Sequence, residues 1–282
     1  LEQFAEKVGG ETHTSNYTYD RDNRVTAIQY DGGTQKMNYT YDELGRVVTR
    51  MAECGTDAGK LTSSYEYVDG GYGTNSTTPL VKKITQNGMN FEYAYDNRGN
   101  IVSEKRGELT TTYAYDALGQ LIRVNDPHEN ATWVYNYDRG GNILNKTKYA
   151  YTTGAVGTAL ETIPYTYGDA NWKDKLTAYN GAAISYDTIS NPVSDGTWTY
   201  TWAKGRQLQS MSKSGETVSF TYNEDGLRVQ KAAISTGTTK YTLHGKNIVH
   251  MTNGSNQQLR FYRIDFQTMH SGYSYALFLH SD

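Results

Sequence analysis

The fold is decided by residues 39–51, Tyr39-Thr40-Tyr41-Asp42-Glu43-Leu44-Gly45-Arg46-Val47-Val48-Thr49-Arg50-Met51. The two tyrosines alternate with a threonine, as residues on one face of a β-strand do. The four residues from Asp42 to Gly45 are typical of a tight turn, because the carboxylate can accept backbone N–H groups and glycine adopts positive φ without strain. Alternation resumes from Val47 to Met51. The stretch therefore predicts a β-hairpin.

The same pattern recurs along the chain, and its second tyrosines Tyr19 and Tyr41 are 22 residues apart, Tyr95 and Tyr115 20 apart. A period of about 20 residues accommodates two short strands and two turns, and it indicates a repeat architecture in which each unit packs against its neighbours. Weaker copies follow from about residue 165 to residue 247. The residues to which we assign the repeat motif are Tyr19, Asp20, Tyr41, Asp42, Gly45, Tyr95, Asp96, Gly99, Tyr115, Asp116, Gly119, Tyr137, Asp138 and Gly141.

The recurring string Tyr-x-Tyr-Asp-x-x-Gly resembles the YD repeats of the RHS family over roughly residues 17–250. Such repeats also occur in toxin-complex C subunits, in wall-associated proteins of Gram-positive bacteria and in teneurins. The resemblance implies an all-β fold, an array of antiparallel β-hairpins in a spiralling, curved sheet that forms a partial β-shell. It also implies that the shell encloses a C-terminal effector, often a toxin.

Three segments are expected from the extent of the repeats. Residues 1–16 are interpreted as the end of a preceding repeat or a cap, residues 17–262 as a single β-shell segment, and residues 263–282 as an atypical tail or boundary. Because the repeats begin so early and no initiator methionine precedes them, we expect a fragment of a longer polypeptide. Its export signal is then expected upstream of this fragment.

Composition favours a thin sheet over a thick core. Hydrophobic residues make up 37% of the chain and its mean hydropathy is −0.73, yet it contains 26 tyrosines and 4 tryptophans. Disordered segments are poor in aromatic residues, so this chain is expected to fold. Tyrosine supplies apolar contact area while its hydroxyl can stay hydrogen-bonded to water. The net charge of −3 gives no basic footprint for nucleic acid. The chain has no run of 18 or more apolar residues, so no membrane span is predicted.

No catalytic residue, cofactor or metal site is predicted. The six histidines lack metal-site spacing, and Cys54 has no cysteine partner within the chain. Asp20 and Asp22 with Asn23 resemble half of a calcium loop, but they lack its glycine and distal glutamate. An aspartate in a hairpin turn already has a structural role.

Two functions remain open, with an enzyme of unrecognised site as a weaker third. The first is a non-enzymatic segment of a secreted or cell-surface protein, part of a shell that encloses or presents a C-terminal effector. The second is a surface carbohydrate-binding or adhesion module, in which exposed aromatic residues stack on sugar rings. The residues for such stacking are Trp198, Tyr200 and Trp202, which share one face of a predicted strand by parity.

Overall fold

The computed structural model describes residues 2–8, 11–54, 59–71, 76–255, 257–262 and 277–280. Every helix or strand in that part of the chain is a β-strand. By contacts between residues the chain divides into two units, Leu1–Lys7 with Thr12–Tyr165, and Val8–Glu11 with Thr166–Asp282. This division falls inside the predicted segment 17–262, whose limits stay a prediction.

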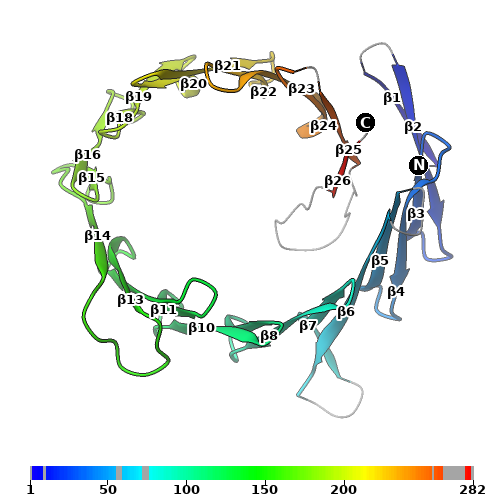
Figure 1. Ribbon diagram of the computed structural model, residues 1–282, viewed down its shortest axis with the longest axis horizontal. Coiled ribbons are helices and arrows are strands. Elements are labelled where there is room, and N and C mark those ends of the chain that lie inside the picture. Colours follow the sequence, from blue (N-terminus) through cyan, green and yellow to red (C-terminus); the bar gives the residue numbers. More distant parts are fainter. Residues whose placement is uncertain are drawn as a thin grey trace. The chain divides into compact units, whose positions relative to one another are not determined.

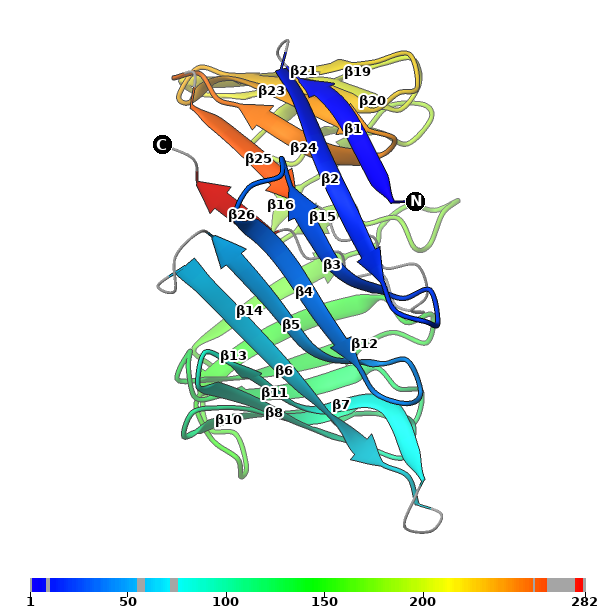
Figure 2. The same cartoon turned by 90° about the vertical axis from the view of Figure 1, so that its right-hand side faces the viewer.

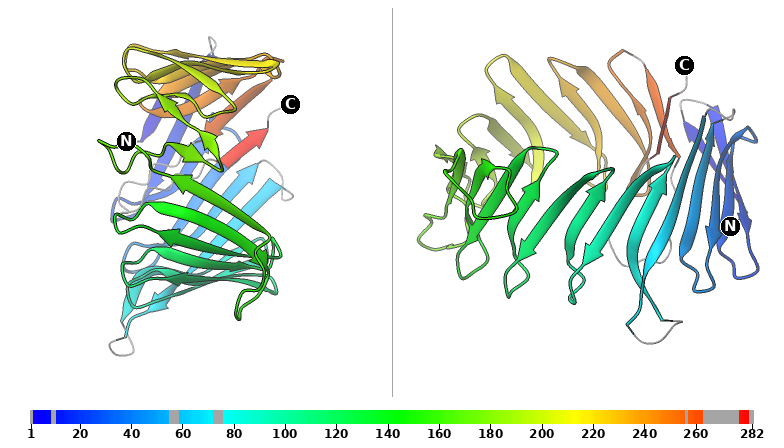
Figure 3. Two further views of the ribbon diagram at one scale, coloured as in Figure 1. Left: turned by 90° about the vertical axis from the view of Figure 1, so that its left-hand side faces the viewer. Right: turned by 60° about the horizontal axis from the view of Figure 1, so that its bottom comes forward.

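The first unit is built from strands that follow one another in chain order. Neighbours in sequence are hydrogen-bonded neighbours in the sheet from β1 through β14, and Figure 1 shows them following a curved course. Figure 3 shows the successive hairpins side by side. The strands are β1 (Gln3–Val8), β2 (Glu11–Tyr19), β3 (Val25–Tyr30), β4 (Gln35–Tyr41), β5 (Val47–Cys54), β6 (Lys60–Asp69), β7 (Thr77–Gln86), β8 (Met89–Tyr95), β9 (Ile101–Arg106), β10 (Leu109–Tyr115), β11 (Leu121–Asp126), β12 (Ala131–Tyr137), β13 (Ile143–Ala150) and β14 (Glu161–Thr166).

The second unit repeats this arrangement with shorter strands at its start. A two-residue hairpin comes first, and a sheet whose strands again follow chain order comes next. The strands are β15 (Ala178–Tyr179), β16 (Ala182–Ala183), β17 (Ser185–Tyr186), β18 (Pro192–Ser194), β19 (Thr199–Ala203), β20 (Gln207–Lys213), β21 (Glu216–Tyr222), β22 (Arg228–Ala233), β23 (Gly237–His244), β24 (Asn247–Thr252), β25 (Gln258–Tyr262) and β26 (Leu277–His280). The predicted all-β array of antiparallel hairpins is thus confirmed.

A β-bulge lies next to the turn in each hairpin that carries a copy of the motif. In the hairpin of β4 and β5, Thr40 pairs with Thr49 and Tyr41 pairs with Val47, so Val48 is one extra residue on the returning strand. A bulge bends its strand and increases the local twist. The same register shift recurs in the hairpins β2/β3, β8/β9, β10/β11, β12/β13, β17/β18, β19/β20, β21/β22 and β23/β24.

The two faces of the first unit's sheet differ in chemistry. On one face Ile28 pairs with Met37 and Met37 with Ala52, and these side chains are only 1%, 2% and 4% exposed. Tyr39 lies on the same face beside Met37 and is also buried. Figure 2 shows the strands of this region, β3 to β5, as adjacent ribbons. This face carries the core.

The opposite face is lined by hydroxyl and amide side chains that bond across the strands. Thr40 and Thr49 have their hydroxyl oxygens 2.6 Å apart, and the amide of Asn125 donates to the hydroxyl of Thr112 at 2.8 Å. The amide of Asn136 likewise donates to Asn145. A sheet with one aromatic and one polar face needs few fully buried apolar residues, as the composition indicates.

Candidate functional site: a repeated turn and an aromatic ladder

Asp42 organises the turn between β4 and β5. Its Oδ1 accepts the backbone N–H of Leu44 at 3.0 Å and that of Arg46 at 2.9 Å. Its own N–H donates to the carbonyl of Arg46, and the N–H of Gly45 donates to the carbonyl of Asp42. One carboxylate oxygen therefore satisfies two backbone donors that have no strand partner.

This turn is repeated with little change along the chain. The oxygen on the first turn residue accepts the N–H two residues on, the N–H four residues on, or both. Asn223 occupies the same position and uses an amide oxygen to accept the N–H four residues on, so the turn needs an acceptor but no charge. The aspartates that accept both N–H groups as Asp42 does are Asp20, Asp96, Asp116, Asp138 and Asp187.

The second carboxylate oxygen binds a side chain four residues on. Arg46 donates through Nε to Oδ2 of Asp42 at 2.7 Å. Asn100 and Asn142 donate through their amides to Asp96 and Asp138, each at 2.9 Å. These side-chain amides, together with the backbone N–H groups of each turn, hold the pKa of both aspartates below its usual range.

The residue three positions after the aspartate takes a left-handed conformation. In most copies it is glycine, with φ of 79° at Gly45 and 85° at Gly99. Asn23 and Ser190 occupy the same position with φ of 60° and 66°. Serine lacks the freedom of glycine there, so the turn at Ser190 carries backbone strain of about 1 kcal/mol.

The second aromatic residue of most motif copies reaches back to the preceding hairpin. The hydroxyl of Tyr41 donates to the carbonyl of Val25 at 2.6 Å, and that of Tyr115 donates to the carbonyl of Ile101 at 2.8 Å. We call this set the aromatic ladder. Its other members are the pairs Tyr67 to Val47, Tyr95 to Val81, Tyr137 to Leu121, Tyr186 to Leu176, Trp202 to Pro192 and Tyr222 to Leu208.

The acceptor carbonyls lie at or near the start of a returning strand, directly after a turn or loop. Each ladder bond therefore fixes the spacing between one hairpin and the next at the sheet edge where the bulges lie. Burial raises the pKa of the phenols of Tyr95 and Tyr115. Their hydroxyls consequently stay protonated donors.

Turn side chains add further bonds between neighbouring turns. Arg24 donates to the carbonyl of Asp42 at 3.3 Å, and its guanidinium lies 5.0 Å from the ring centre of Tyr41. Arg98 donates to the carbonyl of Ala117 at 2.7 Å. In the second unit Asn191 donates to the carbonyl of Gly205, also at 2.7 Å.

The three aromatic residues suggested for sugar stacking have other contacts. Trp202 takes the place of a ladder tyrosine and donates from Nε1 to the carbonyl of Pro192 at 2.7 Å. Tyr200 donates to Oδ2 of Asp195 at 2.6 Å, and Lys213 lies over the ring of Trp198, which precedes β19. All three side chains are half-buried. Sugar stacking by this set stays a prediction.

Other candidate residues bring no catalytic or metal cluster together. Asp20 and Asp22 both pair with Arg24, at 2.7 and 3.0 Å. Within the described ranges, no group of three His, Cys, Asp or Glu side chains is arranged to hold a metal ion, and no helix is long and apolar enough to cross a membrane. Most of the predicted tail 263–282, including 263–276, lies outside the described residues.

Sequence reasoning assigned the turn aspartates and missed their partners. The residues four positions on, such as Arg46 and Asn100, were not singled out, although Arg or Asn recurs at that position. The ladder was missed as well, because its bonds join residues 10 to 20 apart, for example 10 for Trp202 and 20 for Tyr67. The recurrence of tyrosine at the last strand position was the available signal.

Replacing Ser190 by glycine is expected to stabilise the chain, because glycine adopts the left-handed conformation without strain. The matched change Gly45→Ala is expected to destabilise it by about 1 kcal/mol, because it places a Cβ at the corresponding φ of 79°. Urea unfolding of both variants measures the two shifts. Shifts of the same sign would contradict this account of the turn.

Removing one ladder hydroxyl by Tyr137→Phe is expected to lower the free energy of unfolding by about 1 kcal/mol, since the carbonyl of Leu121 loses its donor. Tyr151, exposed in the segment between β13 and β14, provides the control: Tyr151→Phe is expected to leave stability unchanged. Thermal and urea unfolding compare the two variants. Equal effects would show that the ladder bond contributes nothing specific.

Acid is expected to weaken the turns. The lowered pKa values of Asp96 and Asp138 contribute stability above the ordinary aspartate pKa of about 3.9, and that stability is lost as pH falls through the folded-state values. The double variant Asp96→Asn, Asp138→Asn keeps the Oδ1 acceptor of the backbone N–H groups, loses the titrating charge, and should lose less stability between neutral pH and about pH 3. Urea unfolding across this range measures it, with the exposed Asp225→Asn as control. An unchanged pH dependence in the double variant would refute the assignment.

Comparison with known proteins agrees with this geometry. A family model described as the teneurin YD-shell matches residues 60–167. The chain is 30% identical over 235 residues to the tRNA3(Ser)-specific nuclease WapA of Bacillus spizizenii. It has the same identity over the same length with the tRNA nuclease WapA of Bacillus subtilis (strain 168). Each alignment covers 71% of this chain and 9% of the relative, so the chain spans a small part of these nucleases.

A solved structure shares the fold. The Tc holotoxin pore of Photorhabdus luminescens matches with a TM-score of 0.53 and 16% identity, over 90% of this chain and 15% of that chain. At this identity the match speaks for the fold alone. Taken with the repeated turns and the aromatic ladder, these likenesses identify the chain as a YD-repeat protein of the RHS type.

Proposed function

We propose that this chain is a non-enzymatic stretch of shell wall in a larger secreted or cell-surface protein, and that the wall encloses or presents a C-terminal effector of the same polypeptide. The observation that carries the proposal is that the repeated residues make structural contacts. The aspartates bond the turns, and the ladder aromatics bond neighbouring hairpins. Residues that make the same structural contact in most copies serve to build a surface.

The likeness to the WapA nucleases supports the presence of an effector in the parent protein and does not place the nuclease in this stretch. The chain spans 9% of each relative's length, which leaves most of the relative for other parts. Its net charge of −3 gives no basic surface for the backbone of tRNA. We therefore assign the effector to the remainder of the parent polypeptide.

Limited proteolysis of the full-length parent polypeptide tests the enclosure. If the repeats wall in the effector, a protease should leave the effector uncut while the hairpins are folded, and should cut it once mild denaturant opens them. A parent carrying Tyr137→Phe should lose protection at a lower denaturant concentration than one carrying Tyr151→Phe. An effector that is cut at the same rate in native and denatured samples would contradict enclosure.

The isolated chain tests the absence of catalysis. Incubated with total tRNA and magnesium, it is expected to leave the tRNA intact. Specific cleavage of tRNA by the isolated chain, lost when its turns are unfolded by acid, would place the nuclease in this stretch and overturn the proposal.

A further inference from the structure

The loop between β14 and β15 is closed by hydrogen bonds at its base. The N–H of Gly168 donates to the hydroxyl of Thr177 at 2.8 Å, and the N–H of Thr177 donates to the carbonyl of Thr166 at 2.7 Å. All of these residues belong to the second unit. The segment between them is thus held as a defined loop, which we call the Trp172 loop (residues 168–177).

Asp169 fixes the tip of this loop. Its Oδ1 accepts the N–H groups of Asn171 and Trp172 at 2.9 and 3.0 Å, and its Oδ2 lies 3.3 Å from Nζ of Lys175. The backbone N–H of Trp172, followed by that of Asn171, holds the pKa of Asp169 below its usual range. Lys175 in turn lies over the ring of Tyr186, 4.6 Å from its centre. The backbone of Trp172 is therefore positioned before any ligand arrives.

The side chain of Trp172 is 52% exposed. The other tryptophans have polar partners: Trp133 donates to Glu129 at 3.0 Å, Lys213 covers Trp198, and Trp202 belongs to the ladder. Within the part of the chain that the structure describes, the indole of Trp172 makes no hydrogen bond, ring stack or cation contact. A single exposed apolar side chain needs no explanation by itself. Trp172 differs because the backbone that carries it is held by hydrogen bonds at the base and tip of its loop.

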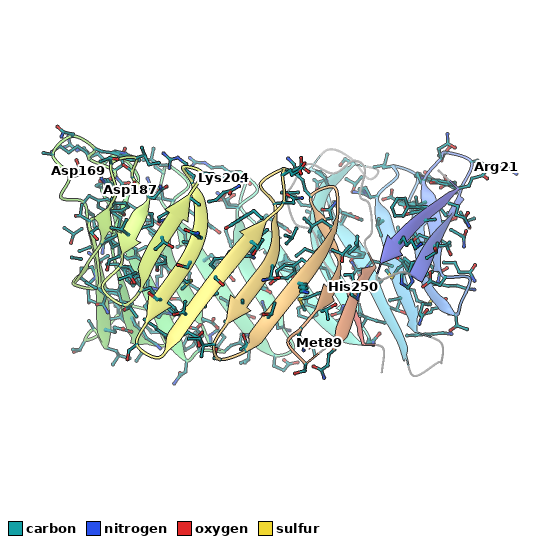
Figure 4. All side chains as sticks on the ribbon, turned by 90° about the horizontal axis from the view of Figure 1, so that it is seen from above. Arg21, Met89, Asp169, Asp187, Lys204 and His250 are labelled. Atoms are coloured by element: carbon teal, nitrogen blue, oxygen red, sulfur yellow. The ribbon has the colours of Figure 1, made fainter. Side chains whose placement is uncertain are left out.

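The surroundings of Trp172 limit what it can bind. Its chain neighbours Asn171, Lys173 and Asp174 are exposed and polar, so the apolar surface at the tip is one indole wide. A stable protein interface needs about 800 Å² on each partner, far more than one indole supplies. Figure 4 shows Asp169 on the same side of the second unit as Asp187 and Lys204.

A pyranose ring fits this surface. Its C–H face is about as wide as an indole, and its hydroxyl groups need planar polar partners such as a side-chain amide. We propose that Trp172 is a stacking platform for one pyranose ring of a glycan, and that the side-chain amide of Asn171 hydrogen-bonds the hydroxyls of that ring. The site is separate from Trp198, Tyr200 and Trp202, and it does not depend on the proposed shell function.

Tryptophan indole N–H resonances of the ¹⁵N-labelled chain test the site, with chitotetraose and cellotetraose as probes. The indole signal of Trp172 is expected to shift saturably, with a dissociation constant in the millimolar range that suits a single stacked ring. The signals of Trp133, Trp198 and Trp202 are expected to stay in place. Assignment follows from the loss of one signal in Trp172→Phe.

Three variants separate stacking from folding. Trp172→Ala is expected to weaken binding by about tenfold or more, since stacking on one aromatic side chain contributes about 1–3 kcal/mol, and to leave the melting temperature unchanged because the side chain is exposed. Trp172→Tyr should retain part of the affinity. Trp133→Phe, which changes a tryptophan with partners of its own, should bind as the wild type does.

Two outcomes would overturn the proposal. One is the absence of any Trp172 shift with either probe up to the solubility limit of the sugar, or a shift confined to Trp198 and Trp202. The other is a Trp172 shift that follows protein concentration without sugar, which would assign the indole to a contact with a second copy of the chain.

Discussion

A tight turn leaves backbone N–H groups without strand partners, and the rest of this structure depends on the side-chain oxygen that accepts them. Asp42 accepts the N–H groups of Leu44 and Arg46 with a single oxygen. Buried or half-buried donors without an acceptor are costly, so a residue with such an oxygen stabilises the turns built as this one is. The use of Asn223 in another copy shows that the requirement is for the acceptor itself.

Two further structural features lie beside the turn: the bulge in the returning strand and the ladder bond from the next hairpin. Directly after each turn the returning strand holds one extra residue, as Val48 does, which bends and twists the pair. At the same edge the ladder hydroxyl of the next hairpin, such as that of Tyr67, bonds the first carbonyl of that strand, here Val47. The bulge supplies curvature and the ladder limits how far neighbouring hairpins can separate. The curvature of each sheet is therefore a local property that recurs with each bulged hairpin of the motif.

The sequence predicted those features that arise within one hairpin. Alternation of tyrosine and threonine indicated the strands, and the Asp-x-x-Gly spacing indicated the turn with positive φ, which holds at Gly45 and Gly99. Features that join different hairpins could not be derived in the same way. Parity showed that Tyr39 and Tyr41 share a face, but it could not show that Tyr41 reaches the carbonyl of Val25 while Tyr39 is buried in the core. The alternation of residue types along the sequence could not predict the register shift at the bulge either.

Substitutions among the copies distinguish the positions that the fold constrains from those that it does not. Trp202 replaces a ladder tyrosine and keeps the same kind of bond, because an indole N–H is also a donor at the end of a large ring. Ser190 replaces a turn glycine and keeps the left-handed conformation with some strain. A position that keeps its contact when its residue changes is constrained by architecture. Trp172 has no counterpart in the motif, and the loop that holds it supplies no partner for its ring. In a repeat array such exceptions to the motif are where binding should be sought first.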